Sequence, residues 1–318
     1  MLRLRFVLLI AITILLGCVS NQKDNTATFT IATLKGPSSM GMIKLIDSLV
    51  NIEDKNFDIK VFNEPIQVRK MILDGTADFA ILPTTMAALI YNKGLDYKVI
   101  AIPVWGTLYL FGSDSTITDW EQLRGKRVHV MAKGMTPDVL FRRLLEKNNL
   151  NPETDLILDY SFPTHIDLAN AIAAKQASLG VISEPMVSLA MQKNKDIRPI
   201  FDLNHEWNRS LNMPIAQTAL LVKGSIIKCN PLVVEQLLVG YQKSSEWVNL
   251  NPDSAANLIV KYNILPNFEV AFNAIPRSNL NFVRANAVQF QIEEYLRVFF
   301  EMNPDIVGGK IPDESFYF

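Results

Sequence analysis

The chain has 318 residues, 49% of them hydrophobic, with 31 basic and 32 acidic side chains. This balance lacks the basic excess of a nucleic-acid-binding protein, and the length suffices for one large core or two smaller ones. With only three histidines and two cysteines, far apart in the sequence, a Cys/His metal cluster is excluded, and we expect no metal and no cofactor.

The N-terminus is typical of a cleaved export signal. Arg3 and Arg5 precede residues 6–16, an apolar run interrupted only by Thr13, which is too short for a membrane span of about 20 residues. The run ends at Leu-Leu-Gly-Cys, which predicts a signal peptide over residues 1–17, lipidation of Cys18 and a flexible tether over residues 18–26. The alternative is an ordinary signal peptide followed by a chance cysteine.

Strands and helices are predicted to alternate along the first two-thirds of the chain, because β-branched apolar runs alternate with apolar stripes at helical spacing. The first series is strand 29–33, helix 38–50, strand 57–62, helix 65–73, strand 79–82, helix 84–91 and extended segments 97–103 and 107–112. The second is strand 127–131, helix 136–148, strand 155–160, helix 165–174, strand 179–182, helix 185–192 and strand 197–201. After an extended segment at 217–222, the last third is predicted to be helical, at 231–249, 252–262 and 285–302. This order favours mostly parallel α/β sheets.

An internal repeat divides the alternating part in two. Residues 77–89 align with 177–189 at an offset of 100, and 35–38 align with 133–136 at an offset of 98. Two extended segments flank the second repeat, so we expect the chain to cross between two α/β lobes twice. Lobe one is predicted as 27–105 plus 219–318 and lobe two as 106–218, with a two-stranded hinge and a cleft between them.

The predicted binding residues follow the strands, because ligands of α/β sheets bind beyond the carboxyl ends of strands, at helix N-termini. In lobe one they are Lys35, Gly36, Pro37, Ser38, Ser39, Met40, Pro83, Thr84 and Thr85; in lobe two they are Gly134, Met135, Thr136, Glu184 and Pro185. Trp105 is added at the hinge, and His205-Glu206-Trp207 is placed in a polar loop near the cleft mouth. For each group a structural role stays open: the hydroxyls as helix caps, Glu184 as a partner of a helix dipole, Trp105 as a packed side chain, and Lys35 with Lys133 as solvated rim charges. No catalytic residue is expected.

Three motifs carry a family resemblance. They are Leu-Lys-Gly-Pro-Ser-Ser-Met-Gly at 34–41, Lys-Gly-Met-Thr-Pro at 133–137, and Asn-Pro-x-x-x-Gly-Gly-Lys-x-Pro-Asp-x-x-Phe-Tyr at 303–317. In these the chain resembles the SsuA/THI5-like (NMT1-like) substrate-binding lipoproteins of ABC transporters. The resemblance implies the type II periplasmic-binding-protein fold, no catalysis, a small-molecule solute, and permease and ATPase subunits as partners. Together with the predicted lipidation of Cys18, we expect a monomer anchored by lipid in the cell envelope, facing the periplasm or the exterior.

Two other functions stay open: a receptor that reports a solute to a signalling partner, and an enzyme on the same fold, for which the chain lacks the Cys-rich motif of pyrimidine-precursor synthases. The six loops that follow the predicted strands, at 34–40, 63–64, 83–85, 132–136, 161–164 and 183–185, contain no arginine. Glu184 would repel an anion, and Trp105 would stack on a flat ring. These features favour a planar, nitrogen-containing solute such as a pyrimidine-type thiamine precursor over a sulfonate or nitrate, which remains the alternative.

Overall fold

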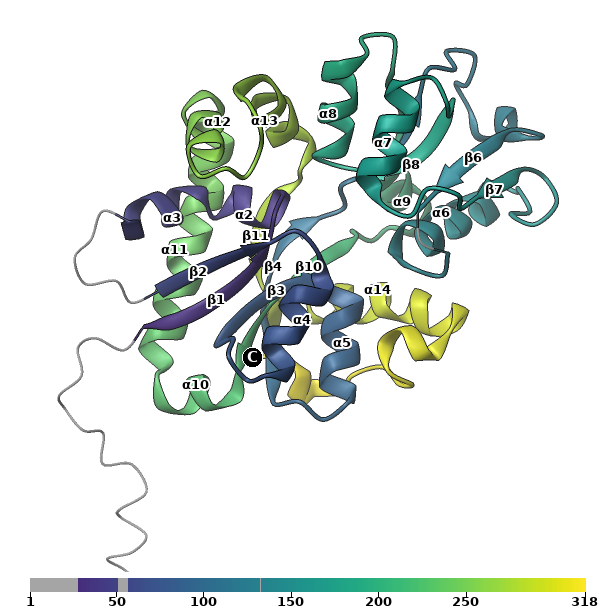
Figure 1. The fold of residues 1–318 in the computed structure, drawn as a ribbon. Helices are drawn as coiled ribbons and strands as arrows, with labels where there is room; N and C mark the ends of the chain where they lie inside the picture. The colour runs from purple at the N-terminus through teal and green to yellow at the C-terminus, as the bar shows by residue number, and fades with distance from the viewer. Residues whose placement is uncertain (1–27, 51–56, 132) are drawn as a thin grey trace, which may run out of the picture.

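The computed structural model describes residues 28–50, 57–131 and 133–318, and folds them into two α/β lobes, each built on its own sheet (Figure 1). The predicted type II two-lobed α/β fold class is confirmed by this architecture and by the structural neighbours described below. The predicted signal peptide, the lipidated Cys18 and the tether lie outside the described residues.

The sheet of the first lobe has six strands and combines both ends of the described chain. Their spatial order is β11 (Leu280–Arg284), β4 (Tyr97–Trp105), β10 (Ala216–Lys223), β3 (Phe79–Pro83), β1 (Phe29–Leu34) and β2 (Phe57–Phe62). β1 is parallel to its neighbours β2 and β3, whereas β10 is antiparallel to β3 and β4. The carboxyl ends of β1, β2 and β3 therefore meet at one edge, which faces the second lobe.

The sheet of the second lobe has five strands and repeats this plan. Their order is β7 (Ile157–Asp159), β6 (Arg127–Val130), β8 (Leu179–Ser183), β5 (Leu108–Gly112) and β9 (Arg198–Asp202). β6 is parallel to β7 and β8, and β5 is antiparallel to β8 and β9. The chain passes from β4 to β5 and returns after β9 to β10, so two connections join the lobes.

The 100-residue offset of the sequence repeat is also an offset between structural elements. Helix α4 (Pro65–Leu73) corresponds to α7 (His165–Ala173), and β3 corresponds to β8. The turns after the two helices match as well, since Gly75 and Lys175 both have a positive φ, of 68° and 62°. The two lobes are thus two copies of one supersecondary plan.

Helices cover both faces of each sheet with their apolar sides, as the near-continuous apolar character of the strands requires. In the first lobe, one face packs against α2 (Pro37–Gly41), α3 (Ile43–Val50), α10 (Gly224–Cys229), α11 (Pro231–Leu250), α12 (Pro252–Lys261) and α13 (Phe268–Ala274). The other face packs against α4, α5 (Thr84–Asn92) and α14 (Gln289–Met302). In the second lobe, α6 (Thr136–Lys147) and α9 (Leu203–Leu211) cover one face, and α7 with α8 (Met186–Lys193) covers the other.

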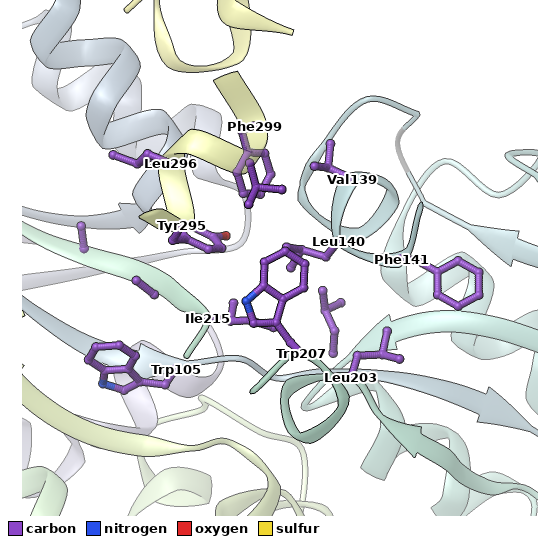
Figure 2. Packing of buried hydrophobic residues seen from close by; sticks show 14 of the residues in the cluster. Trp105, Val139, Leu140, Phe141, Leu203, Trp207, Ile215, Tyr295, Leu296 and Phe299 are labelled. Atoms are coloured by element: carbon purple, nitrogen blue, oxygen red, sulfur yellow. The ribbon is translucent and has the colours of Figure 1, made fainter. Parts of the chain in front are cut away.

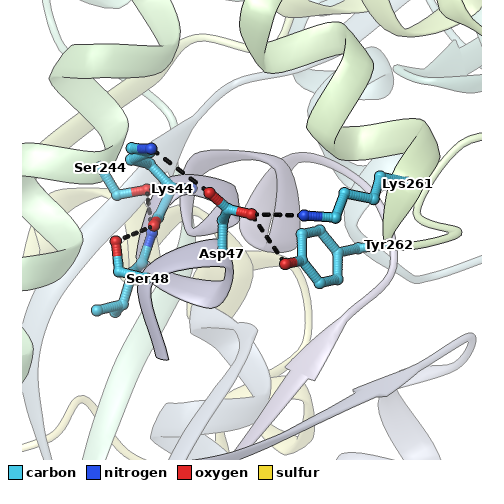
Figure 3. A network of polar contacts seen from close by, with 7 residues as sticks. Lys44, Asp47, Ser48, Ser244, Lys261 and Tyr262 are labelled. Atoms are coloured by element: carbon cyan, nitrogen blue, oxygen red, sulfur yellow. Dashed lines mark hydrogen bonds and ion pairs between the residues drawn. The ribbon is translucent and has the colours of Figure 1, made fainter. Parts of the chain in front are cut away.

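The predicted helix 38–50 is wrong in one respect, because it is broken at Met42 into α2 and α3. Ser244 of α11 satisfies the backbone at the break: its hydroxyl donates to the Gly41 carbonyl at 2.7 Å and accepts from the N–H groups of Lys44 and Leu45. Asp47 of α3 holds α12 in place by accepting from Lys261 and from the Tyr262 hydroxyl, both at 2.9 Å (Figure 3). Ser244, which lies 200 residues after Lys44, therefore decides where the predicted helix breaks.

Two further predictions are corrected. The polar loop expected at His205-Glu206-Trp207 is the helix α9, whose N-cap Asp202 accepts from the N–H groups of Asn204 and His205. Trp207 is fully buried, so this helix faces the core and does not reach the cleft mouth with that side chain. The last third is not wholly helical either, since it contributes the edge strand β11, and the helix expected from residue 285 begins only at Gln289 as α14.

Candidate functional site

The two lobes touch where two of the predicted binding loops face each other. Gly36, in the turn between β1 and α2, and Pro185, in the turn between β8 and α8, are both buried. A Cβ atom added to Gly36 would lie 3.4 Å from Cδ of Pro185, which is van der Waals contact. The structure thus brings together one predicted loop from each lobe, with the lobes close to one another.

The turn between β1 and α2 is held rigidly by its own residues. Gly36 has φ 123° and ψ −145°, a conformation that only glycine adopts readily. The Ser39 hydroxyl accepts from the Gly36 N–H at 3.2 Å and donates to the Gly36 carbonyl at 3.1 Å, and Tyr241 donates to the Ser38 carbonyl at 2.7 Å. Ser39 therefore has the capping role left open above.

The remaining residues of this loop have different surroundings. Met40 is fully buried in the core between the first sheet and α11. Lys35 is exposed and its N–H donates to the Phe62 carbonyl at the end of β2, at 2.7 Å. Pro37 is partly exposed as the first residue of α2. Of this motif, Gly36 faces the second lobe, whereas Met40 packs inward.

Glu184 forms an ion pair across the lobes that sequence reasoning does not predict. Its carboxylate is completely buried and accepts from Nε of Arg277, which lies in the 3-10 helix Ile275–Arg277 before β11. Ser188 completes the group: its hydroxyl donates to Glu184 Oε1 at 3.0 Å and accepts from Nη2 of Arg277 at 2.8 Å, and its N–H donates to Oε2 at 3.2 Å. Burial raises the pKa of Glu184, and the charge of Arg277 opposes that effect.

A second contact ties the same arginine to lobe two. The hydroxyl of Tyr109 in β5 donates to the backbone carbonyl of Arg277 at 3.0 Å, and burial raises the pKa of this tyrosine, so it stays a donor at neutral pH. Nearby, Gln192 of α8 and Lys195, two residues after that helix, donate to the Glu269 carboxylate of α13. We call Glu184, Ser188, Tyr109 and Arg277 the inter-lobe latch, because every one of its bonds to Arg277 joins the two lobes.

Three buried hydroxyls lie along the carboxyl edge of the first sheet. Thr33 is the last residue but one of β1, Thr84 follows β3, and Thr218 of β10 is paired with Pro83. Within the described part of the chain, their Oγ1 atoms have no hydrogen-bond partner. Because an unpaired buried hydroxyl is unfavourable, this edge is suited to a solute or water that would bond to it. Thr85, beside them, is also buried, and Pro83 is partly exposed.

The corresponding loop of lobe two is more open. Gly134 has φ 78°, and a Cβ added there would meet nothing within 4 Å, so its glycine is required by the backbone and not by a close approach. Its N–H donates to Asp138 at 2.7 Å, and Asp138 in turn pairs with Arg142 and accepts from Tyr160. Met135 is 51% exposed, Thr136 is partly exposed, and Lys133 lies over the Tyr160 ring.

Trp105 lies apart from the predicted binding loops. It is the last residue of β4, it is 7% exposed, and its indole N–H donates to the Asn281 carbonyl of β11 at 2.7 Å. β11 is the edge strand on the side of the hinge opposite to β3, β1 and β2. Trp105 therefore belongs to the packing behind the hinge.

An apolar seam joins the lobes on the face opposite to the latch. Tyr295 and Phe299 of α14 share one buried cluster with Leu140 of α6 and Trp207 of α9 (Figure 2). An ion pair supports this seam, since Nη2 of Arg143 in α6 lies 3.7 Å from Oε2 of Glu301 at the end of α14. The latch and this seam close two sides of the space between the lobes, and the loops after β2 and β7 flank the remaining side.

Sequence reasoning missed Arg277, Ser188, Tyr109, Thr33 and Thr218. Ser188 could have been found from the sequence, since it stands four residues after Glu184 at the start of a helix. Side chains at that spacing are neighbours on the helix surface. Arg277 had none, because it lies 93 residues from Glu184 and only the fold brings them together.

The described residues contain neither a metal centre nor a membrane span. No group of His, Cys, Asp and Glu side chains in that part of the chain is arranged to hold a metal ion. Nor does any helix there have the length and apolar character needed to cross a membrane.

Comparison with known proteins places the chain among transport proteins. Residues 42–223 match the family model described as "ABC transporter, phosphonate, periplasmic substrate-binding protein". The binding protein YtlA of Bacillus subtilis is 25% identical over 183 residues, which are 56% of this chain and 52% of YtlA. The match thus spans about half the length of that curated relative.

Solved structures agree over nearly the whole chain. The crystal structure of an ABC transporter protein from Parabacteroides distasonis is 26% identical, with a TM-score of 0.80 over 92% of this chain and 99% of that one. The periplasmic aliphatic sulphonate-binding protein SsuA of Escherichia coli, at 17% identity, shares the fold with a TM-score of 0.70 over 91% of this chain and 95% of its own. The predicted resemblance to SsuA-like proteins is confirmed, and since the family model covers more than half of its residues, the chain belongs to the family of periplasmic phosphonate-type substrate-binding proteins of ABC transporters.

Proposed function

We propose that this protein is the lipid-anchored, extracytoplasmic solute receptor of an ABC importer, that it is not an enzyme, and that it delivers a small polar solute to a permease and its ATPase. The observation that carries the proposal is the close approach of the Gly36 turn to Pro185, beside the Glu184–Arg277 pair. Bonds between two lobes that are joined by only two connections can form and break as the lobes close and open. Family membership supports the same function.

The solute is proposed to carry an oxyanion group, of the phosphonate or sulfonate class, bound between the carboxyl edges of the two sheets. Both features that favoured a planar, weakly basic solute are weakened, because Arg277 compensates the charge of Glu184 and Trp105 lies behind the hinge. The unpartnered hydroxyls of Thr33, Thr84 and Thr218 are donors suited to oxyanion oxygens. The names of the family and of the sulphonate-binding structural neighbour point to the same class.

A thermal-shift panel tests this assignment. The protein is heated with 2-aminoethylphosphonate, methylphosphonate, taurine, nitrate and 4-amino-5-hydroxymethyl-2-methylpyrimidine, since a solute that binds the folded form raises Tm by mass action. We expect a phosphonate or a sulfonate to stabilise the wild-type chain and to have little effect on Gly36→Val, whose side chain would press on Pro185. Stabilisation by the pyrimidine alone would overturn the proposed solute class, and a solute that stabilises both proteins equally would place the site elsewhere.

The proposed lipid anchor has a separate test. Cys18→Ala should move the protein from the membrane to the soluble fraction and abolish labelling with an alkyne fatty acid, because Cys18 is the proposed site of acylation. The matched control is Cys229→Ser, which removes the exposed free thiol of the described chain and should leave both readouts unchanged. Membrane retention and labelling of Cys18→Ala would refute the anchor.

A further inference from the structure

A pocket of about 510 Å³ lies behind the hinge and is separate from the predicted binding loops. Its walls come from both lobes: Asn204 and Pro214 belong to the segment that follows β9, whereas Asn279, Leu280 and Val283 belong to β11 and the turn before it. The other lining residues are Trp105, Asn249, Ile275, Pro276, Asn281 and Val288. Its volume lies within the range of about 300–1,000 Å³ that small-molecule sites occupy.

The topology puts this pocket on the opposite side of the hinge from the cleft. In the first sheet, β11 lies beyond β4 and β10, and the binding loops follow β3, β1 and β2 on the other side. In the second sheet, β9 lies beyond β5, and the binding loops follow β8, β6 and β7. The pocket therefore lies on the other side of the two connections from the binding loops.

The chemistry of the walls selects a class of ligand. None of the lining side chains carries a charge, and four of them are carboxamides, on Asn204, Asn249, Asn279 and Asn281. A carboxamide both donates and accepts hydrogen bonds, and it suits neutral amides better than ions. The rest of the wall is the Trp105 indole, prolines and aliphatic side chains, which favour a flat or compact apolar body.

Two of the four carboxamides keep their side chains accessible. Asn249 and Asn281 are exposed, and the Asn281 side chain makes no hydrogen bond within the described chain. The Asn249 amide donates to the Leu280 carbonyl at 2.6 Å, and Asn279 donates to the carbonyl of Gly106, so these two are positioned by the backbone of β11 and of the hinge. Two of the four carboxamides are therefore held in place by the backbone around the pocket.

We propose that this hinge pocket is a second small-molecule site, which takes a small neutral molecule with an amide group and a flat body. Binding at the pocket does not rest on the proposed transport function.

The experiment uses nicotinamide as the probe, because it combines a carboxamide with a flat ring. Saturation-transfer NMR on the full-length protein, with no solute added, should detect binding to the wild-type chain and to Gly36→Val, whose cleft is altered. Asn281→Trp, which fills the pocket from an exposed position, should weaken probe binding by about tenfold or more. Asn286→Trp, a substitution of another exposed asparagine outside the pocket, is the matched control and should bind as wild type.

Absence of nicotinamide binding up to its solubility limit, or equal binding to wild type and Asn281→Trp, would overturn the site.

Discussion

Replacing Arg277 with methionine tests the inter-lobe latch. Methionine keeps the length of the side chain but removes both hydrogen bonds to Glu184 and Ser188. In the closed form it leaves a carboxylate that is completely buried and has lost its only cationic partner among the described residues. In an open form the same carboxylate can reach water, so the penalty falls mainly on closure.

The size of the effect follows from the contacts. A hydrogen bond to a charged group is worth about 1.5–3 kcal/mol, and removing one partner of a buried ion pair costs about 3–5 kcal/mol. The Arg277 side chain is 24% exposed, so we take the lower range. Since about 1.4 kcal/mol corresponds to a tenfold change, Arg277→Met should weaken solute binding by about 10- to 100-fold.

Titration calorimetry measures this change, with Arg284→Met as the matched control. Arg284 also pairs with a carboxylate, Glu235, but this pair is exposed and lies within lobe one, so its loss should leave the solute affinity unchanged. In the double variant Glu184→Gln/Arg277→Met, part of the affinity should return, because no unpaired charge is then buried. The reasoning is refuted if Arg277→Met binds no more weakly than Arg284→Met does.

Three further outcomes are expected. Gly36→Ala should lower the free energy of unfolding by about 1–3 kcal/mol, because φ 123° with ψ −145° strains any residue with a Cβ; an unchanged urea midpoint would contradict this. Trp207→Ala should cost about 3–5 kcal/mol in the same assay, because it empties a fully buried position in the seam, and a loss below about 1 kcal/mol would argue against tight packing there. Burial lowers the pKa of His165 to about 4, so the unfolded chain takes up its proton near pH 6.5 while the folded chain does so only near pH 4. Stability should therefore fall as the pH drops through this window, and His165→Gln should flatten the pH dependence of the urea midpoint; an identical dependence in both proteins would rule out this role.

The fold was largely predictable because its signals are local. Each of the strands β1, β3 and β8 is a short apolar run, and the repeat at an offset of 100 is enough to indicate two copies of one plan. The failures have non-local causes. The break between α2 and α3 depends on Ser244, and β11 becomes a strand because it pairs with β4.

The candidate site was predictable only in part. The approach of the Gly36 and Pro185 loops to each other could be inferred, because ends of parallel strands meet at one sheet edge. Their contact with a solute stays a prediction. The charge of the site was not predictable, because Glu184 looks like an unpaired acid until the fold brings Arg277 to it from the far end of the chain. Trp105 lies at the hinge as predicted and has the packed role that was left open, since sequence does not tell on which side of a hinge a side chain lies.

The central claim, that a solute closes the two lobes on each other, is tested most directly by a distance across the cleft. Ile66 and Ile166, equivalent residues at the starts of α4 and α7, are 60% and 51% exposed, and spin labels can replace them as cysteines in a chain with Cys18→Ser and Cys229→Ser. Pulsed electron paramagnetic resonance should give a longer or broader distance distribution without solute, and one shorter distance with the solute found in the thermal-shift panel. Arg277→Met should shift the population back toward the longer distance. Identical distributions with and without saturating solute would contradict the account.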